Sequence, residues 1–348
     1  PTAPDAGQRL TLGTRLPGTP VTGRTARLGD RDVAVLAVDA TRVDAVTGLD
    51  LHGADLVQQR PTLVDPQPGS AVDLAATVHP DAEAGWPTGV TGQPRIAAYA
   101  LVAGPDGAPI RLAMGELAVR TELGMVVGEL PVWKVTTSRA RLALPPLPAG
   151  TTLAGLQLVV DTVPLARLDV RLTAPGSWNL LGNDRSAGAV VGKSSGTGGF
   201  TVEVSSTAAN VTLTAGPSKP LVSQVVPVLA DEAGAALLAG TASPALQFDG
   251  LNVPVRVVRR ATLPSPATTD TGPATLGGSA PTLLVDAATL ASVELAAGRR
   301  PRVPTTWWLP AETDAAAARD AVRSLWPGAD GATPAPGADA EVTVTVGG

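Results

Sequence analysis

The sequence predicts an α+β fold rich in β-structure: an α/β scaffold formed by both chain ends, carrying an inserted, jelly-roll-like β-sandwich. Short strand-like segments between turn residues dominate the middle of the chain, whereas strand–helix patterns occur near both ends. Glycine (38 residues) and proline (33 residues) together make up about a fifth of the 348 residues, which favours turns over long helices. We therefore assign residues 1–60 to the first part of the scaffold, 61–218 to the sandwich and 219–348 to the second part of the scaffold.

The composition excludes several classes of function. A net charge of −5 gives no support to nucleic-acid binding, which usually needs a basic face. No cysteine is present, so thiol catalysis, zinc–thiolate sites and disulfide bonds are excluded. No apolar run reaches the roughly 20 residues that span a bilayer. The chain opens on Pro1 rather than methionine, so we expect a mature form or an excised part of a longer protein.

The stretch Pro281–Pro310 is the most informative part of the sequence. Residues 283–285 form an apolar run typical of a strand in a covered sheet. Asp286 follows at a strand-to-helix corner, where its carboxylate can cap the first free N–H groups of a helix. A helix is predicted over residues 287–297 and a second strand over 305–309. This β-α-β unit contains no reactive side chain, which favours a binding or transmitting role.

Residues 37–46 resemble part of this stretch. In both places an apolar strand ends in Val-Asp-Ala and is followed by a short helical pattern, at Val38-Asp39-Ala40 and at Val285-Asp286-Ala287. A duplicated strand–helix element explains the similarity. Coincidence in a chain rich in alanine and valine explains it equally well.

The middle of the chain contains several short strand patterns. A hairpin is predicted around Gly104–Pro109, with Asp-Gly at its tip. Further strands are predicted at 153–160, 165–172, 200–204 and 211–213, whereas Gly182–Gly199 is rich in glycine and serine and is predicted to be a surface loop.

After residue 216 the strand–helix pattern returns. The sequence predicts a strand at 225–229, a helix at 231–238 and a hairpin turning on Asp249-Gly250. A helix at 313–325 and a final strand at 341–346 complete the chain.

No catalytic constellation is recognisable, so we predict that the chain is not an enzyme. The two histidines, His52 and His79, lie far apart in the sequence, and either could serve a metal site or a catalytic triad only with partners that the sequence does not identify. Gly192-Lys193-Ser194 lacks the correctly spaced first glycine of a phosphate-binding loop. We therefore predict no cofactor in this chain, so any nucleotide hydrolysis would have to take place in another chain.

Polar residues in the predicted sandwich loops allow a calcium site. Asp106, Asn183 and Asp184 carry the oxygen ligands that calcium prefers. Ordinary turn chemistry explains the same residues, because aspartate and asparagine are favoured in turns.

Trp307 and Trp308 admit two interpretations. Neighbours on a strand face opposite sides, so both can be buried only if the strand is covered on both faces. The alternative is that an indole marks a face directed to a membrane or a partner, where Arg299, Arg300 and Arg302 would suit anionic head groups.

The order of elements after Val226 resembles the extracytoplasmic region of FtsX-like ABC-transporter permeases from GC-rich Gram-positive bacteria. The resemblance is carried by residues 226–230 followed by a helix, then by 253–258, 263–264 and 284–290. Residues 305–309 look like the recurring Glu-Trp-Trp-Leu segment of that group, with Thr306 where glutamate is usual. The match covers residues 220–310, with a looser one over 1–60.

This resemblance implies a non-catalytic domain at the extracytoplasmic face of the cell membrane, attached through transmembrane helices absent from this chain. A cytoplasmic ATP-binding subunit would drive the complex, and the outer domain would bind a cargo or partner and relay motion. Lipids, lipoproteins or peptides are the cargo that the resemblance suggests. We expect binding in a groove between scaffold and sandwich, since domain junctions often form pockets.

Two other classes remain open from the sequence. A secreted carbohydrate-binding or adhesin-type β-sandwich would need exposed aromatic side chains. The candidates in the middle of the chain are Trp86, Tyr99, Trp133, Trp178 and Phe200. A hydrolase would need both histidines and a carboxylate in one cleft.

Overall fold

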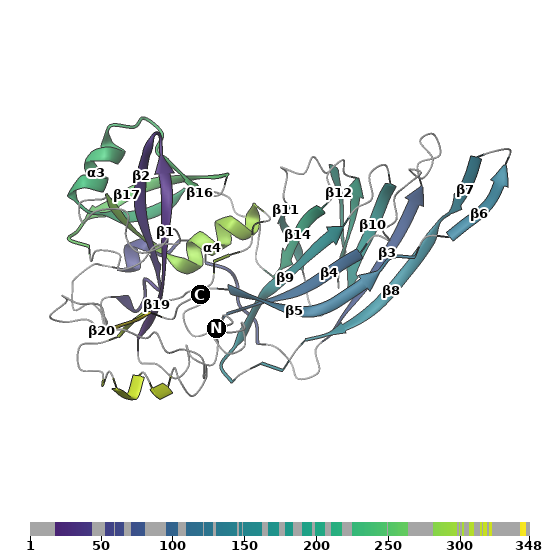
Figure 1. Ribbon diagram of the computed structural model, residues 1–348, viewed down its shortest axis with the longest axis horizontal. Coiled ribbons are helices and arrows are strands. Elements are labelled where there is room, and N and C mark those ends of the chain that lie inside the picture. Colours follow the sequence, from purple (N-terminus) through teal and green to yellow (C-terminus); the bar gives the residue numbers. More distant parts are fainter. Residues whose placement is uncertain are drawn as a thin grey trace.

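The structure is a computed structural model of the 348-residue chain. It describes residues 18–43, 53–58, 60–65, 71–80, 95–103, 109–120, 122–127, 130–144, 146–147, 149–161, 166–173, 178–183, 190–196, 199–205, 210–217, 225–248, 250–263, 281–297, 299, 301–302, 306–309, 314, 316–318, 320–321 and 342–345. These residues form a β-rich fold with several sheets (Figure 1), which confirms the prediction of a chain made mostly of β-structure.

One sheet has eight strands and takes them from both ends of the sequence. In spatial order they are β16 (Ala245–Phe248), β17 (Leu251–Arg260), β15 (Val226–Ala230), β18 (Thr282–Asp286), β2 (Arg31–Val38), β1 (Thr19–Leu28), β19 (Thr306–Leu309) and β20 (Val342–Thr345). Two neighbouring pairs are parallel, β18 with β2 and β15 with β17. A further pair joins Arg27 of β1 to Gln247 of β16, so the sheet curls until these strands meet.

Both faces of this eight-stranded sheet are covered. Its helical elements are α3 (Glu232–Ala239), α4 (Ala287–Ala296) and the short 3-10 helix η1 (Gly53–Leu56). Leu238 of α3 and Leu290 of α4 pack on one face, and Leu56 of η1 packs on the other. Strands β15 and β18 are therefore buried along their whole length, which explains their continuous apolar sequence.

Strands from the middle of the sequence form two antiparallel, five-stranded sheets, which we call the two-sheet unit. One sheet is β12 (Val190–Gly196), β13 (Gly199–Ser205), β10 (Ala166–Thr173), β3 (Ala71–Pro80) and β8 (Thr136–Ala143); the other is β11 (Asn179–Asn183), β14 (Asn210–Gly216), β9 (Thr152–Asp161), β4 (Arg95–Ala103) and β5 (Pro109–Ala118). Alternate residues of both sheets, such as Leu74, Ile96 and Leu158, share one core.

The structure corrects the predicted surface loop at Gly182–Gly199. Residues 190–196 of this stretch form strand β12, which pairs with β13 from Val190↔Ser205 to Gly196↔Gly199. Glycine and serine have low intrinsic strand preference, so this strand depends on its pairing with β13 at the sheet edge.

Other predicted elements lie close to the observed ones. Ala103 of β4 pairs with Pro109 of β5, as the predicted hairpin requires, although residues 104–108 of its turn lie outside the described part of the chain. Of the predicted helix at 313–325, residues 316–318 and 320–321 are helical and the remainder is not described. Strands β6 (Glu122–Val127) and β7 (Leu130–Lys134) form a separate two-stranded sheet.

Helix α4 lies between the eight-stranded sheet and the two-sheet unit (Figure 1). It contacts β2 and β18 on one side and β11 on the other. Every residue from Ala288 to Leu295 is buried, so this helix has no solvent-facing stripe. Within the described residues, no helix combines the length and apolar character needed to cross a membrane.

Candidate functional site

Asp286 ends strand β18 and caps helix α4. Its Oδ2 accepts the backbone N–H of Thr289 at 2.9 Å and lies 2.7 Å from the Thr289 hydroxyl. Its Oδ1 accepts the backbone N–H of Ala40 at 3.2 Å. The side chain is completely buried, and a buried carboxylate is tolerated only with donors of this kind.

Asp39 occupies the equivalent corner at the end of β2. Strands β2 and β18 are parallel neighbours with Asp286 in register with Val38, so the two aspartates lie at the same edge of the sheet. Asp39 Oδ1 accepts the N–H of Thr41 at 3.1 Å and lies 2.7 Å from its hydroxyl. Val43 N–H donates to the Asp39 carbonyl at 3.1 Å. The two sequence segments thus form adjacent strand–aspartate corners.

Arg60 joins the two corners. Its Nη2 donates to Asp39 Oδ1 at 2.8 Å and also to Asp286 Oδ1, while its Nε donates to Asp286 Oδ2 at 3.0 Å. Burial lowers the pKa of the Arg60 guanidinium, but the hydrogen bonds and charges of Asp286 and Asp39 outweigh it and hold that pKa above its ordinary value. Arg60 is therefore a fixed positive charge at every physiological pH.

The charges of this trio do not balance. Two buried carboxylates share one guanidinium, and Asp39 Oδ2 has no hydrogen-bond partner among the described residues. The side chains of Asp39 and Asp286 are 1 % and 0 % exposed, whereas that of Arg60 is 24 % exposed. Solvent or another molecule can therefore reach this trio at Arg60.

A second buried ion pair fixes the C-terminal part of α4. Glu294 of α4 accepts a hydrogen bond from Arg24 of β1, and their side chains are 6 % and 4 % exposed. The Arg24 guanidinium lies 4.3 Å from the centre of the Phe248 ring of β16, a cation–π contact. This pair ties α4 to two strands of the eight-stranded sheet.

The same end of α4 contacts the two-sheet unit. Leu295 packs in one cluster with Leu101 of β4 and Ala154 of β9. Just beyond the helix, the Arg299 carbonyl accepts the side-chain N–H of Gln157, which is fully buried in β9, at 3.2 Å. The junction between α4 and the two-sheet unit is thus packed and hydrogen-bonded.

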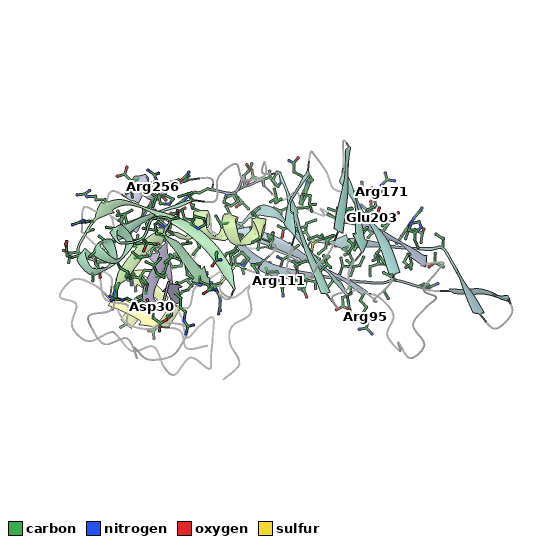
Figure 2. The ribbon with its side chains drawn as sticks, turned by 90° about the horizontal axis from the view of Figure 1, so that it is seen from above. Asp30, Arg95, Arg111, Arg171, Glu203 and Arg256 are labelled. Atoms are coloured by element: carbon green, nitrogen blue, oxygen red, sulfur yellow. The ribbon has the colours of Figure 1, made fainter. Side chains whose placement is uncertain are left out.

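A continuous chain of polar contacts crosses this junction. Arg299 N–H donates to the Glu294 carbonyl at 2.8 Å, which links Gln157 through Arg299 to the Arg24 ion pair. On the other side, Arg111 Nη1 donates to Gln157 Oε1 at 3.2 Å and its guanidinium lies 3.9 Å from the centre of the Tyr99 ring. Figure 2 shows Arg111 beside the end of the two-sheet unit that is next to α4. Such an arrangement connects the eight-stranded sheet to the two-sheet unit through polar contacts.

Three of the five residues predicted to form a membrane- or partner-facing edge have described side chains: Arg299, Arg302 and Trp308. Trp308 is 5 % exposed and packs with Val21 and Val38, so it is a core residue rather than part of a contact face. It is buried because β19 lies between β1 and β20 in the sheet and because its side chain packs in the same cluster as Leu56 of η1. Arg302 is exposed and Arg299 is half-buried at the junction. Arg300 and the Trp307 side chain lie outside the described part of the chain.

Neither of the two aromatic candidates for carbohydrate binding with described side chains is exposed. Trp178 is buried in the core of the two-sheet unit, and the ring of Tyr99 lies under Arg111. Trp86 and the side chains of Trp133 and Phe200 are not described.

The predicted metal and phosphate candidates do not assemble into a site in the described residues. His79 Nε2 lies 2.8 Å from Asp169 Oδ2 on adjacent strands, whereas His52 is not described. Asn183 ends β11, while Asp106 and Asp184 lie outside the described ranges. Residues 192–194 lie in strand β12 and not in a loop before a helix. Among described residues, no group of three or more metal-ligating side chains occurs.

Sequence reasoning did not identify Arg60, Arg24 or Glu294. The available signal was the only charged residue of an otherwise uncharged helix, Glu294 in α4, whereas β1 contains Arg27 as well as Arg24 and gives no such signal. Such residues are almost never fully buried unless paired. No comparable pattern marks Arg60, which follows η1 in an irregular segment.

Comparison with known proteins gives no match: no protein-family model, no curated protein and no solved structure is significantly similar to this chain. The resemblance to FtsX-like permeases therefore stays a prediction based on the order of sequence motifs.

Proposed function

We propose that this chain is a non-catalytic extracytoplasmic domain of an ABC-transporter permease, at the outer face of the cell membrane, which binds a cargo or partner and relays ATP-driven motion. In this proposal the ATP is used by a separate cytoplasmic subunit, connected through transmembrane helices outside this chain. A lipid, lipoprotein or peptide would be the cargo. The eight-stranded sheet with its helices would be the α/β scaffold, and the two-sheet unit the inserted jelly-roll-like sandwich.

The observation that carries the proposal is the position of α4. This helix is buried on all sides and contacts both units. The Glu294 ion pair and the Asp286 cap connect it to the eight-stranded sheet, and Leu295 packs against the two-sheet unit. Packed interiors deform little and switch as whole bodies. A displacement of the eight-stranded sheet would therefore carry the two-sheet unit with it.

The arrangement of the outer strands suits attachment at one edge. Thr19 of β1 pairs with Trp308 of β19, and Trp308 pairs with Thr343 of β20, so the first and last described strands lie two apart in one sheet. Val21 and Asp286 are both in register with Val38, so the corner aspartates lie at the same end of the strands as the start of β1. Force applied here would act close to the start of α4.

The packed junction changes the expected binding surface. Where α4 meets the two-sheet unit, Leu295, Leu101 and Ala154 are buried in one cluster. Buried Gln157 bonds the Arg299 carbonyl beside it. We therefore propose that the junction transmits motion, and that cargo or partner binding uses exposed surface elsewhere. From the predicted contact edge we retain the exposed Arg302, which lies just beyond α4 and the junction.

The class of protein is tested on the full-length gene product. We expect membrane-spanning segments flanking this chain and co-purification with a nucleotide-binding subunit. A full-length product without membrane segments would overturn the proposal. A glycan-binding screen with hits that are lost in Trp133→Ala would instead favour the carbohydrate-binding alternative.

The relay itself is tested with an engineered disulfide, for which the cysteine-free chain is a clean background. In Ala154→Cys/Leu295→Cys, the reduced protein lacks the packing of Leu295 at the junction. In the oxidised protein a disulfide bond joins α4 to β9. We expect ATP-driven activity of the reconstituted complex to be low when reduced and close to the parent's when oxidised. High activity when reduced and low activity when oxidised would mean that the junction must flex, and would contradict a rigid relay.

A matched control uses a disulfide away from the junction. The hydroxyl oxygens of Thr77 and Thr137 lie 2.9 Å apart on neighbouring strands of the two-sheet unit. We expect Thr77→Cys/Thr137→Cys to respond little to oxidation.

A further inference from the structure

A short segment runs from the eight-stranded sheet to the two-sheet unit alongside α4 and contacts that helix. It is residues 58–65, described except for residue 59, and we call it the connector. It follows η1 and leads towards β3, the first strand of the two-sheet unit. Leu63 of the connector packs against the junction cluster that contains Leu295.

The connector is bonded near its start to helix α4 and to the two corner aspartates. Gln58 N–H donates to the Thr289 hydroxyl at 3.1 Å, and that hydroxyl lies 2.6 Å from the Gln58 carbonyl. Two residues further on, Arg60 bonds both corner aspartates. Thr289 is also the residue whose N–H is capped by Asp286, so both contacts meet at the start of α4.

The connector is bonded to the two-sheet unit near its end. Val64 and Leu153 of β9 exchange two backbone hydrogen bonds, Val64 N–H to Leu153 O at 2.9 Å and Leu153 N–H to Val64 O at 2.8 Å. Among the described residues this is an isolated bridge and not part of a longer ladder. Its persistence therefore depends on how firmly the rest of the connector is held.

Arg60 supplies the positive charge that allows the buried carboxylates of Asp39 and Asp286 to lie close together. Without it, Asp39 and Asp286 would be two buried carboxylates facing each other with no positive charge in the trio, and like charges at short range in a poorly solvated site repel strongly. Loss of Arg60 would thus do more than remove hydrogen bonds: the two corners would separate to admit water.

We propose that Arg60 is an electrostatic latch that closes the connector onto both aspartate corners and thereby fixes the two-sheet unit relative to α4. Its exposed portion makes it the point at which an outside change can open the latch. The role of the latch in relaying motion rests on the proposed function. The latch itself is a property of the folded chain and is measured without transport.

The test is residue-resolved hydrogen exchange on the whole chain with Arg60→Met. We expect the Val64 and Leu153 amides to exchange at least about tenfold faster, whereas amides in the middle of β3 and β10 keep their protection. Unchanged exchange at Val64 and Leu153 would overturn the latch.

A double variant separates the charge effect from loss of packing. In Arg60→Met/Asp39→Asn one of the two facing charges is removed with almost no change of shape, so we expect most of the protection at Val64 and Leu153 to return. No recovery would mean that packing rather than charge holds the connector, which would also overturn the latch.

Two further variants keep the test decisive. Arg260→Met removes an arginine from an exposed ion pair with Glu232 and should leave both amides unchanged. If Arg60→Met does not fold, Arg60→Lys keeps the charge but loses the forked geometry, and we expect intermediate exchange rates. A protein that turns out not to be a permease would refute the proposed function and leave these exchange rates unaffected.

Discussion

Helices α3 and α4 begin in the same way and differ in almost everything else. Each follows a fully buried strand and is capped by an aspartate: Asp231 accepts Gly234 N–H at 2.6 Å, and Asp286 accepts Thr289 N–H at 2.9 Å. Each aspartate also bonds a neighbouring strand segment, Asp231 through Thr282 N–H at 3.0 Å.

The surroundings of the two helices are different. Helix α3 exposes one side, including Glu232, whereas α4 is buried on all sides. Asp231 meets backbone donors, but Asp286 also meets the guanidinium of Arg60. The same local signal therefore produces a peripheral cap in one place and the centre of an ionic network in the other, and the difference comes from tertiary position alone.

The largest contrast is expected between the two capping aspartates. Asp286→Ala should lower the free energy of unfolding by about 3–5 kcal/mol, because it removes one partner of a buried, hydrogen-bonded ion pair. Asp231→Ala should lower it by about 1–2 kcal/mol, the usual effect of losing an N-cap that also bonds a second backbone N–H. Urea denaturation of both variants measures the difference, and equal effects would contradict the distinction between the two helices.

The sequence predicted the local half of this comparison. The strand–aspartate–helix corner at Asp286 follows from an apolar run, capping preference and helix-forming residues, all of which act within a few positions. Asp231 was predicted only as the first residue of a helix that follows a strand. The similarity between the segments at Asp39 and Asp286 was also visible, and the structure places them side by side on parallel strands.

The ionic network could not be predicted because its partners are distant in sequence. Arg60 and Asp286 are 226 positions apart, and Arg24 and Glu294 are 270 apart, so no periodicity connects them. Strand β12 was missed for a related reason, since its Gly- and Ser-rich sequence becomes a strand only through pairing with β13. In each case tertiary contact outweighs local preference.

The next effect in size concerns the Arg24–Glu294 pair, which only α4 has. Glu294→Gln should lower the free energy of unfolding by about 3 kcal/mol, since the buried Arg24 guanidinium loses the negative charge of Glu294. Replacing both residues, as Arg24→Met/Glu294→Leu, should recover stability to within about 1 kcal/mol of the parent, because neither desolvated charge remains. Denaturation curves of the single and double variants test this, and a double variant as unstable as the single one would show that the pair acts through shape.

A smaller effect is expected where α4 meets the two-sheet unit. Gln157→Leu keeps the volume but removes the donor to the Arg299 carbonyl and the acceptor for Arg111, at a cost of about 1–3 kcal/mol for the two hydrogen bonds lost. The effect should be concentrated at the junction, so hydrogen exchange at the Arg299 amide is the informative measurement. Faster exchange throughout β9 instead would mean that Gln157 supports the sheet rather than the junction.

The smallest effect is expected on the exposed side of α3. Arg260 Nη1 lies 3.4 Å from Glu232 Oε1, and the side chains are 61 % and 85 % exposed. Water and salt screen such a pair, and both long side chains lose freedom in forming it, so Arg260→Ala should change the free energy of unfolding by no more than about 0.5 kcal/mol. The comparison with Arg24 is direct, because both arginines pair with a glutamate of a helix that packs on the same sheet. If denaturation in low salt gave Arg260→Ala an effect as large as that of Glu294→Gln, burial would not be what distinguishes α4 from α3, and the case for α4 as the relay would lose its physical basis.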